Sequence, residues 1–259
     1  MNAVYEEMIS FIVSSGKRIA PKAGKIKDIG VKKKYLTEED IAIERGMKKI
    51  IHHHHPAHAF YAEEEHDQHP EGTDVWIADP ISGTRSFLAG LPHYALVIAH
   101  ARNSIVQFSA VYDPSADELF TAYRGKGAFL NKKKLFLLPK KGILHIVFNL
   151  SINWADAQSA QEVAEKMRNF SVSTNSNSHA VNICHVACNR YDGAICLAKD
   201  SFPYFAASLI LTEAGGLFTN QYGDPIIHYH DRVFLGGKPS TYQQLKKIME
   251  HVKLPENSR

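Results

Sequence analysis

The sequence is poor in cysteine. Its three cysteines, Cys184, Cys188 and Cys196, are an odd number lying close together, which argues against a disulfide framework and favours reduced thiols. Cys184 and Cys188 are four residues apart on an expected helix, but a zinc site would need two further ligands in register. We therefore interpret the cysteines as buried structural thiols.

The sequence also lacks long apolar runs and a strong charge of either sign. Its longest apolar runs, such as residues 96–99, are far too short to span a bilayer, and residues 1–20 do not have the composition of a secretion signal. A formal net charge of +3 over 259 residues is too small for a dedicated nucleic-acid binder. We therefore expect a cytoplasmic protein without a membrane or nucleic-acid partner.

Local runs of basic residues do not change this expectation. Lysines at 32–34 and 132–134 are interpreted as solvated loops, with attraction of phosphate as the weaker alternative. Four consecutive histidines at 52–55 precede Pro56, and they cannot all face one point on a helix. This run therefore predicts an exposed helix end rather than a metal site.

The patterning of apolar residues changes along the chain. Helical spacing near the N-terminus is followed by a second helix after Thr37, whose hydroxyl can cap it. Several strand-like segments separated by turns follow from residue 59, and strands then alternate with helices. We expect an α/β protein with an α+β first lobe, residues 1–135, and an α/β second lobe, residues 136–259.

A carboxylate ends a buried-looking strand in DVWIADPISGT, residues 74–84. Asp79 stands directly before a proline, which is how many α/β enzymes present a carboxylate to a metal or phosphate. Glu63, in the acidic cluster AEEE at 62–65, is a second candidate. Taken alone, Glu63 also fits a solvated acidic turn and Asp79 also fits a turn-former before proline.

Three motifs together carry a resemblance: AEEE at 62–65, DPISGT at 79–84 and FPYFAASLILTEAGG at 202–216. In this order and spacing they resemble the inositol monophosphatase family of metal-dependent phosphomonoesterases. Thr37-x-x-Asp40-x-x-x-Glu44 adds support, so the resemblance covers nearly the whole chain. GTRSFLAGLP, from residue 83, is more similar to the histidinol-phosphate phosphatase branch. The resemblance implies a layered αβαβα sugar-phosphatase fold, a homodimer and a small phosphorylated metabolite as substrate.

The family pattern also implies roles for individual residues. Glu63 and Asp79 would bind a first Mg²⁺ with the main-chain carbonyl of Ile81, and Thr84 with Glu63 would orient the attacking water. Asp79, Glu63 and Thr84 would thus be the catalytic group of a phosphoric monoester hydrolase. If a helix begins near Gly83 and Thr84, its free N–H groups would point at the phosphate.

The chain departs from the family at two expected ligands of a second metal. Carboxylates of the family fall on Ser82 and Pro203, and proline offers neither a side-chain ligand nor an N–H group. Loss of a carboxylate ligand costs a few kcal/mol, and each ~1.4 kcal/mol is tenfold in affinity. We therefore expect one retained Mg²⁺ site, a weak or absent second one, and slow or absent turnover. A shifted alignment would let Asp200 replace the missing carboxylate.

The expected substrate wall differs as well. Cys196 stands where the family often has a glutamate that binds a substrate hydroxyl, and His179 stands where it has a small alanine. Since a thiol does not accept a hydrogen bond as a carboxylate does, inositol phosphate is a doubtful substrate. Two functions stay open: a weakened Mg²⁺-dependent phosphatase of a small polyol or amino-alcohol phosphate, and a catalytically inactive member binding a phosphorylated ligand or protein partner in a regulatory role.

Overall fold

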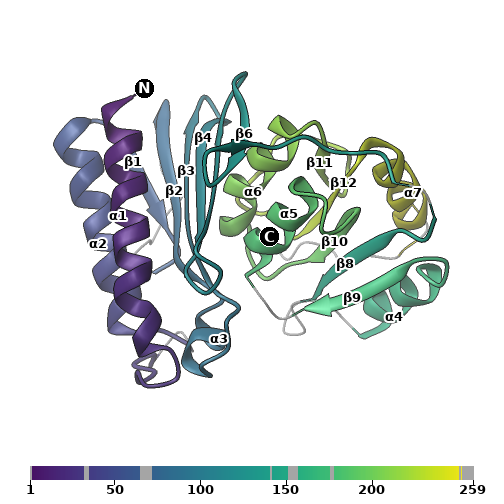
Figure 1. The fold of residues 1–259 in the computed structure, drawn as a ribbon, viewed down its shortest axis with the longest axis horizontal. Coiled ribbons are helices and arrows are strands. Elements are labelled where there is room, and N and C mark those ends of the chain that lie inside the picture. Colours follow the sequence, from purple (N-terminus) through teal and green to yellow (C-terminus); the bar gives the residue numbers. More distant parts are fainter. Residues whose placement is uncertain are drawn as a thin grey trace.

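The computed structural model describes residues 2–31, 35–64, 72–140, 142–150, 157–175, 178–250 and 252. In these residues, helices and sheets form successive α, β, α, β and α layers (Figure 1). The predicted αβαβα architecture is therefore confirmed. The lysine run at 32–34 and Glu65 lie outside the described residues.

Helices α1 (Ala3–Ile19) and α2 (Glu38–His54) form the first layer. Thr37 caps α2 as predicted, since its hydroxyl accepts from the Asp40 N–H while the Asp40 carboxylate accepts from the Thr37 N–H. The helix ends within the histidine run, whose first two members are exposed. The prediction of an exposed helix end at residues 52–55 is confirmed.

The second layer is a sheet with strand order β1-β2-β3-β4-β5-β6-β7. Strands β1 and β2 are parallel and the remaining neighbours are antiparallel. Both faces are covered by helices, so alternate residues of each central strand enter different cores. The strands are β1 (Ala59–Ala62), β2 (Asp74–Ser82), β3 (Ala95–Arg102), β4 (Ile105–Asp113), β5 (Glu118–Tyr123), β6 (Gly127–Leu130) and β7 (Lys133–Lys134).

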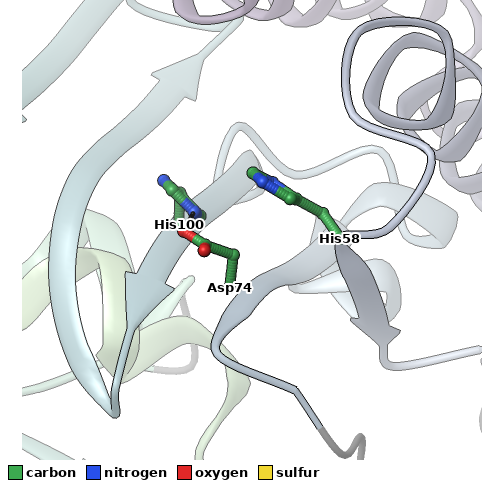
Figure 2. A group of neighbouring side chains, drawn as sticks. All are labelled: His58, Asp74 and His100. Atoms are coloured by element: carbon green, nitrogen blue, oxygen red, sulfur yellow. Dashed lines mark hydrogen bonds and ion pairs between the residues drawn. The ribbon is translucent and has the colours of Figure 1, made fainter.

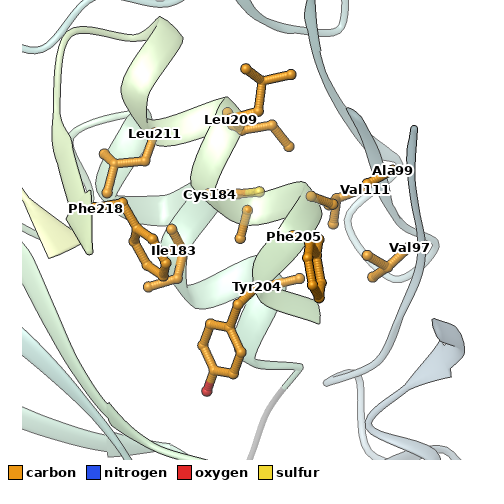
Figure 3. Close-up of a cluster of buried hydrophobic side chains, with 14 of the residues drawn as sticks. Val97, Ala99, Val111, Ile183, Cys184, Tyr204, Phe205, Leu209, Leu211 and Phe218 are labelled. Carbon is orange, nitrogen blue, oxygen red and sulfur yellow. The ribbon is translucent and has the colours of Figure 1, made fainter. Parts of the chain in front are cut away.

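Helices α5 (His179–Ala187) and α6 (Phe202–Glu213) fill the middle layer. Nearly all of α6 is buried, as expected for a helix that is apolar on every side. Figure 3 shows Phe205 and Leu209 of α6 beside Val97 and Val111 of the first sheet, all in one buried cluster. Both helices also contact strands of the second sheet. The division into lobes at residue 135 stays a prediction, because one core joins the two sheets.

The second sheet has strand order β11-β12-β10-β8-β9, and helices α4 (Ala157–Lys166) and α7 (Pro239–Met249) lie on its outer face. Its strands are β8 (His145–Leu150), β9 (Ser171–Asn175), β10 (Gly193–Leu197), β11 (Leu217–Asn220) and β12 (Val233–Gly237). The three cysteines are free thiols, as expected. Among the described helices, none has both the length and the apolarity to cross a membrane.

Candidate functional site

Two carboxylates meet at the end of the only parallel strand pair in the described part of the first sheet. Strands β1 and β2 pair from Ala59 with Val75 to Ala62 with Ala78, so Glu63 follows β1 where Asp79 continues β2. The Glu63 N–H donates to the Ala78 carbonyl at 3.2 Å, which fixes the backbone at this point. The structure therefore brings together the two acidic residues that the sequence predicted as ligands.

Asp79 is buried in an environment that disfavours its charge. Its Oδ1 atom has no hydrogen-bond partner among the described residues, and the side chain is almost fully buried. Burial raises the pKa of Asp79 well above its usual value, and the charges of Glu63 and Asp200 raise it further. A cation placed here would relieve both the repulsion and the unpaired oxygen.

Asp200, rather than residue 203, completes this acidic group. It lies between β10 and α6, and its charge acts on Asp79 as described above. The Lys199 Nζ atom lies 3.6 Å from Glu63 Oε1 and 4.0 Å from Asp200 Oδ2. Pro203 is buried in the first turn of α6, where a proline is well tolerated, and it presents no ligand. The structure thus places the alternative residue, Asp200, in the group.

Thr84 forms a second polar group beside the carboxylates. It begins the short helix α3 (Thr84–Leu88), and its hydroxyl lies 2.7 Å from the Ile81 carbonyl and 3.3 Å from Asp40 Oδ1. Burial raises the pKa of Asp40 to about 7, against the hydrogen bonds from Thr37. The Thr84 hydroxyl thus has a fixed orientation beside the Ile81 carbonyl.

Ser82 and Gly83 form the turn between these groups. The Ser178 hydroxyl donates to the Ser82 hydroxyl at 2.9 Å, and both residues are buried. Gly83 has a φ of 89°, and a Cβ atom there would lie 2.7 Å from the His93 carbonyl oxygen. Only glycine therefore fits this position without displacing the backbone of residue 93.

The two predicted substrate-wall residues contact neighbouring side chains, and His179 is half-buried. The His179 Nδ1 atom lies 2.6 Å from the Tyr204 hydroxyl, and burial lowers the pKa of His179 to about 4. Cys196 is fully buried and accepts a hydrogen bond from Asn149 at 3.2 Å, while burial raises the pKa of its thiol to about 12. Substrate contact stays a prediction for both residues.

A sequence model of the inositol monophosphatase family matches residues 5–253. The chain belongs to the inositol monophosphatase family. It is similar to the inositol-1-monophosphatase of Rhizobium meliloti strain 1021, with 28% identity over 97% of this chain and 93% of the relative. It is also similar to Nus factor SuhB of Haemophilus influenzae, with 35% identity over 71% of this chain and 70% of the relative.

Solved structures of the family share this fold. The TM-score is 0.82 for an IMPase of Thermotoga maritima, at 21% identity over 95% of this chain and 96% of that chain. It is 0.85 for the extragenic suppressor protein suhB from Bartonella henselae, at 22% identity over 96% of this chain and 99% of that chain. Because several relatives are named as a Nus factor, the comparisons do not support the expected absence of a nucleic-acid partner.

Inositol monophosphatases are typically Mg²⁺-dependent, and the acidic group fits such an ion. Mg²⁺ prefers oxygen ligands, and Glu63, Asp79 and the Ile81 carbonyl supply them. The buried Oδ1 atom of Asp79, which has no hydrogen-bond partner among the described residues, is the observation that favours a cation here. The number of ions and the homodimer stay predictions.

Sequence reasoning gave no role to Asp40 or Lys199. Asp40 belongs to the Thr37-x-x-Asp40 pattern, but its contact with Thr84 joins residues 44 positions apart. Lys199 is a single basic residue between a strand and a helix, and its sequence neighbours give no sign of Glu63. The one available signal was the Lys-Asp pair directly before an apolar helix, at a strand end where ligands commonly bind.

Proposed function

We propose that this chain is a Mg²⁺-dependent phosphomonoesterase that acts on a small polyol or amino-alcohol phosphate. The supporting observation is the acidic group of Glu63, Asp79 and Asp200. Asp79 is almost fully buried in it, the other two carboxylates raise the pKa of Asp79, and one oxygen of Asp79 has no hydrogen-bond partner among the described residues. Such a group is costly in a folded protein unless a cation compensates it. A function that needs a divalent cation accounts for its presence.

The residues around the acidic group then have separate tasks. When bound, Mg²⁺ would neutralise phosphate oxygens and lower the pKa of a water. The Thr84 hydroxyl, held near Ile81 and Asp40, would orient the attacking water together with Glu63. The turn at Ser82 and Gly83 would lie against the phosphate. Glu63 is half-buried, so it can face both the protein and a ligand.

The second metal position would have more carboxylate ligands than the DPISGT motif alone indicates. Ser82 supplies a neutral oxygen that is already engaged with Ser178. Asp200, whose charge acts on Asp79, would restore the charge that Pro203 cannot supply. We therefore propose a second ion site lacking one carboxylate rather than two, with weakened rather than absent turnover.

The alternative is a catalytically inactive member with a regulatory role. The relatives named Nus factor SuhB favour this alternative. It would use the same site to bind a phosphorylated ligand or partner without hydrolysis.

One experiment separates the two functions. Phosphate release from myo-inositol phosphate, histidinol phosphate and p-nitrophenyl phosphate would be measured across a Mg²⁺ series for the wild type and Ser82→Asp. A phosphatase would release phosphate only with Mg²⁺, and Ser82→Asp would lower the Mg²⁺ concentration needed for half-maximal rate by about tenfold, the equivalent of ~1.4 kcal/mol.

Two further variants serve as controls. Ser178→Ala removes the hydroxyl that contacts Ser82 without adding charge, so it should leave the Mg²⁺ requirement nearly unchanged. Asp79→Asn should abolish any genuine activity of the chain. Absence of phosphate release from the wild type and from Ser82→Asp, with each substrate, would instead support the non-catalytic alternative.

A further inference from the structure

A second group of metal-ligating side chains lies at the opposite end of strand β2. One ring nitrogen of His58, one of His100 and one carboxylate oxygen of Asp74 lie within 4.8 Å of one another (Figure 2). Asp74 and Asp79 are five positions apart on one strand, so the two groups are separated by about 17 Å at 3.3 Å per residue. The family motifs do not include any of these three residues.

Strand pairing brings the three residues together. Trp76 of β2 is paired with His100 of β3, and Asp74 is paired with Arg102, so these side chains share one face of the sheet. His58 directly precedes β1, whose first residue pairs with the residue after Asp74. The trio is therefore supported by three adjacent strands, which makes it more rigid than a group on a loop.

Neighbouring groups already orient both imidazole rings. The Tyr5 hydroxyl lies 2.8 Å from His100 Nδ1, and His100 Nε2 lies 3.0 Å from an oxygen of Asp74. If Nε2 binds a metal, the His100 proton moves to Nδ1, where the Tyr5 oxygen can accept it. Metal-binding histidines are commonly oriented in this way by a second hydrogen bond.

Two contacts compete with an ion. The Trp76 indole N–H donates to His58 Nδ1 at 3.2 Å, and the Arg102 guanidinium donates to Asp74 at 2.8 Å. His58 is only half-buried, so its ring can turn, and the Arg102 side chain is 57% exposed and can leave for solvent. The metal-free state is therefore a satisfied hydrogen-bond network that an ion must replace.

We propose that His58, His100 and Asp74 bind one divalent transition-metal ion such as Zn²⁺. Two imidazole nitrogens and one carboxylate are ligands that favour Zn²⁺ over Mg²⁺. Ligand atoms around a tetrahedral Zn²⁺ are about 3.4 Å apart, given bonds of about 2.0–2.1 Å. His100 Nε2 and the Asp74 oxygen, 3.0 Å apart, are already this close, so only the more distant ligand atoms, which lie within 4.8 Å of one another, need to approach. Because His58 follows α2 while Asp74 and His100 lie on the sheet, the ion would hold the segment after α2 on the sheet, which makes its role structural.

Metal binding can be measured without reference to activity. The full chain, stripped with EDTA and then dialysed, would be titrated with Zn²⁺ by calorimetry in excess Mg²⁺, and its thermal unfolding followed in parallel. We expect one Zn²⁺ per chain and a rise in Tm, since a ligand that binds only the folded state stabilises it. His58→Asn and Asp74→Asn should each weaken Zn²⁺ binding at least tenfold.

Three further substitutions, which should either strengthen Zn²⁺ binding or leave it unchanged, make this test specific. Arg102→Gln removes the competing guanidinium and should strengthen Zn²⁺ binding several-fold, which a merely structural hydrogen bond would not explain. His53→Asn changes an exposed histidine outside the trio, and Asp79→Asn changes the other acidic group, so both should leave the affinity unchanged. Circular dichroism of each metal-free variant checks that it folds.

The results that overturn the proposal are equally defined. Failure of the folded wild type to bind Zn²⁺ stoichiometrically would show that the trio is only a hydrogen-bond network. Loss of binding in His53→Asn would place the ion on the histidine run, and loss in Asp79→Asn would place it in the Mg²⁺ site. None of these results depends on phosphatase activity, so the proposed function is tested separately.

Discussion

The two ends of strand β2 present similar acids in opposite environments. At one end, burial raises the pKa of Asp74, but the hydrogen bonds and charges of Arg102 and His100 outweigh it, so its pKa is lowered. At the other end, Asp79 has carboxylates as its charged neighbours, and its pKa is raised. The same strand therefore carries one acid that is compensated within the protein and one that is not.

This difference indicates what each end can bind. An acid whose charge is balanced by neighbouring groups, such as Asp74, stabilises the folded protein. An ion that binds there must displace these existing partners. An acid whose charge is not balanced, such as Asp79, destabilises the folded protein. Binding of a hard cation beside it offsets this loss of stability. We therefore expect the Asp79 end to control Mg²⁺-dependent activity and the Asp74 end to control stability.

The largest effect is expected for Asp79→Asn. Removal of this carboxylate should lower kcat at least 10²–10³-fold, the usual effect of losing one important electrostatic group. In EDTA, however, the variant should be more stable than wild type at pH 8. A group with a raised pKa in the fold contributes stability at low pH that is lost as the pH rises, and asparagine does not ionise.

Asp74→Asn is the matched control at the other end of the strand. It should leave kcat nearly unchanged and lower Tm, because the acceptor of Arg102 and His100 loses its negative charge and their hydrogen bonds to it weaken. Activity assays and thermal unfolding of both variants provide the comparison. Equal loss of activity in both variants would remove the distinction between the two ends.

Asp200→Asn should have the next largest effect. If Asp200 supplies the charge that Pro203 cannot, the Mg²⁺ concentration for half-maximal activity should rise about tenfold or more, which corresponds to ~1.4 kcal/mol. Pro203→Ala is the control, since it removes a residue that offers no ligand. A Mg²⁺ requirement that responds to Pro203→Ala but not to Asp200→Asn would contradict our assignment of Asp200.

Glu63 and Asp79 could be predicted from the sequence more easily than Asp200. Glu63 and Asp79 lie in motifs that the sequence shows directly, although the parallel pairing of β1 with β2, which brings them together, is seen only in the structure. The role of Asp200 depends on the path of the chain between β10 and α6, where a shift of three residues decides which side chain lies near enough for its charge to act on Asp79. Helix α6 was predictable from its apolar run, but its first turn, with Pro203, was not.

The trio at Asp74 was beyond sequence reasoning for a different reason. His58, Asp74 and His100 carry no local pattern, and only the exact register of β1, β2 and β3 makes them neighbours. A slip of one residue would turn each side chain to the other face. The histidine run at 52–55 is the conspicuous feature of the sequence, but the histidine that lies at the sheet is His58, which follows the run.

A fall in pH should also act in opposite ways at the two ends of β2: protonation of Asp79 stabilises the fold, whereas protonation of His100 destabilises it. Burial lowers the pKa of His100 to about 4, despite the hydrogen bond to Asp74. Its usual pKa is about 6.5, so this histidine contributes stability above pH 6.5 that is lost as the pH falls toward 4. In EDTA, the free energy of unfolding should fall by up to about 1.4 kcal/mol per pH unit for this one proton.

His100→Gln tests this pH dependence. The variant should be less stable at pH 8, because it loses its packing on Trp76, but its stability should fall less steeply between pH 6.5 and 4. Urea unfolding at several pH values measures the slope. An unchanged slope would show that other groups, such as the half-buried His179 and His185, whose pKa values are also lowered, dominate the acid response.

The smallest effect is expected for Lys199→Met. The ammonium lies close to Glu63 and Asp200, where it partly compensates the charge that a cation would otherwise compensate. Because the Lys199 side chain is 57% exposed, solvent screens these contacts, so its removal should tighten Mg²⁺ binding only two- to threefold. Calorimetric titration with Mg²⁺ checks this, with Lys126→Met as the control on an exposed turn. If Lys199→Met weakens Mg²⁺ binding or abolishes activity at saturating Mg²⁺, the ammonium assists the phosphate rather than competing with the ion.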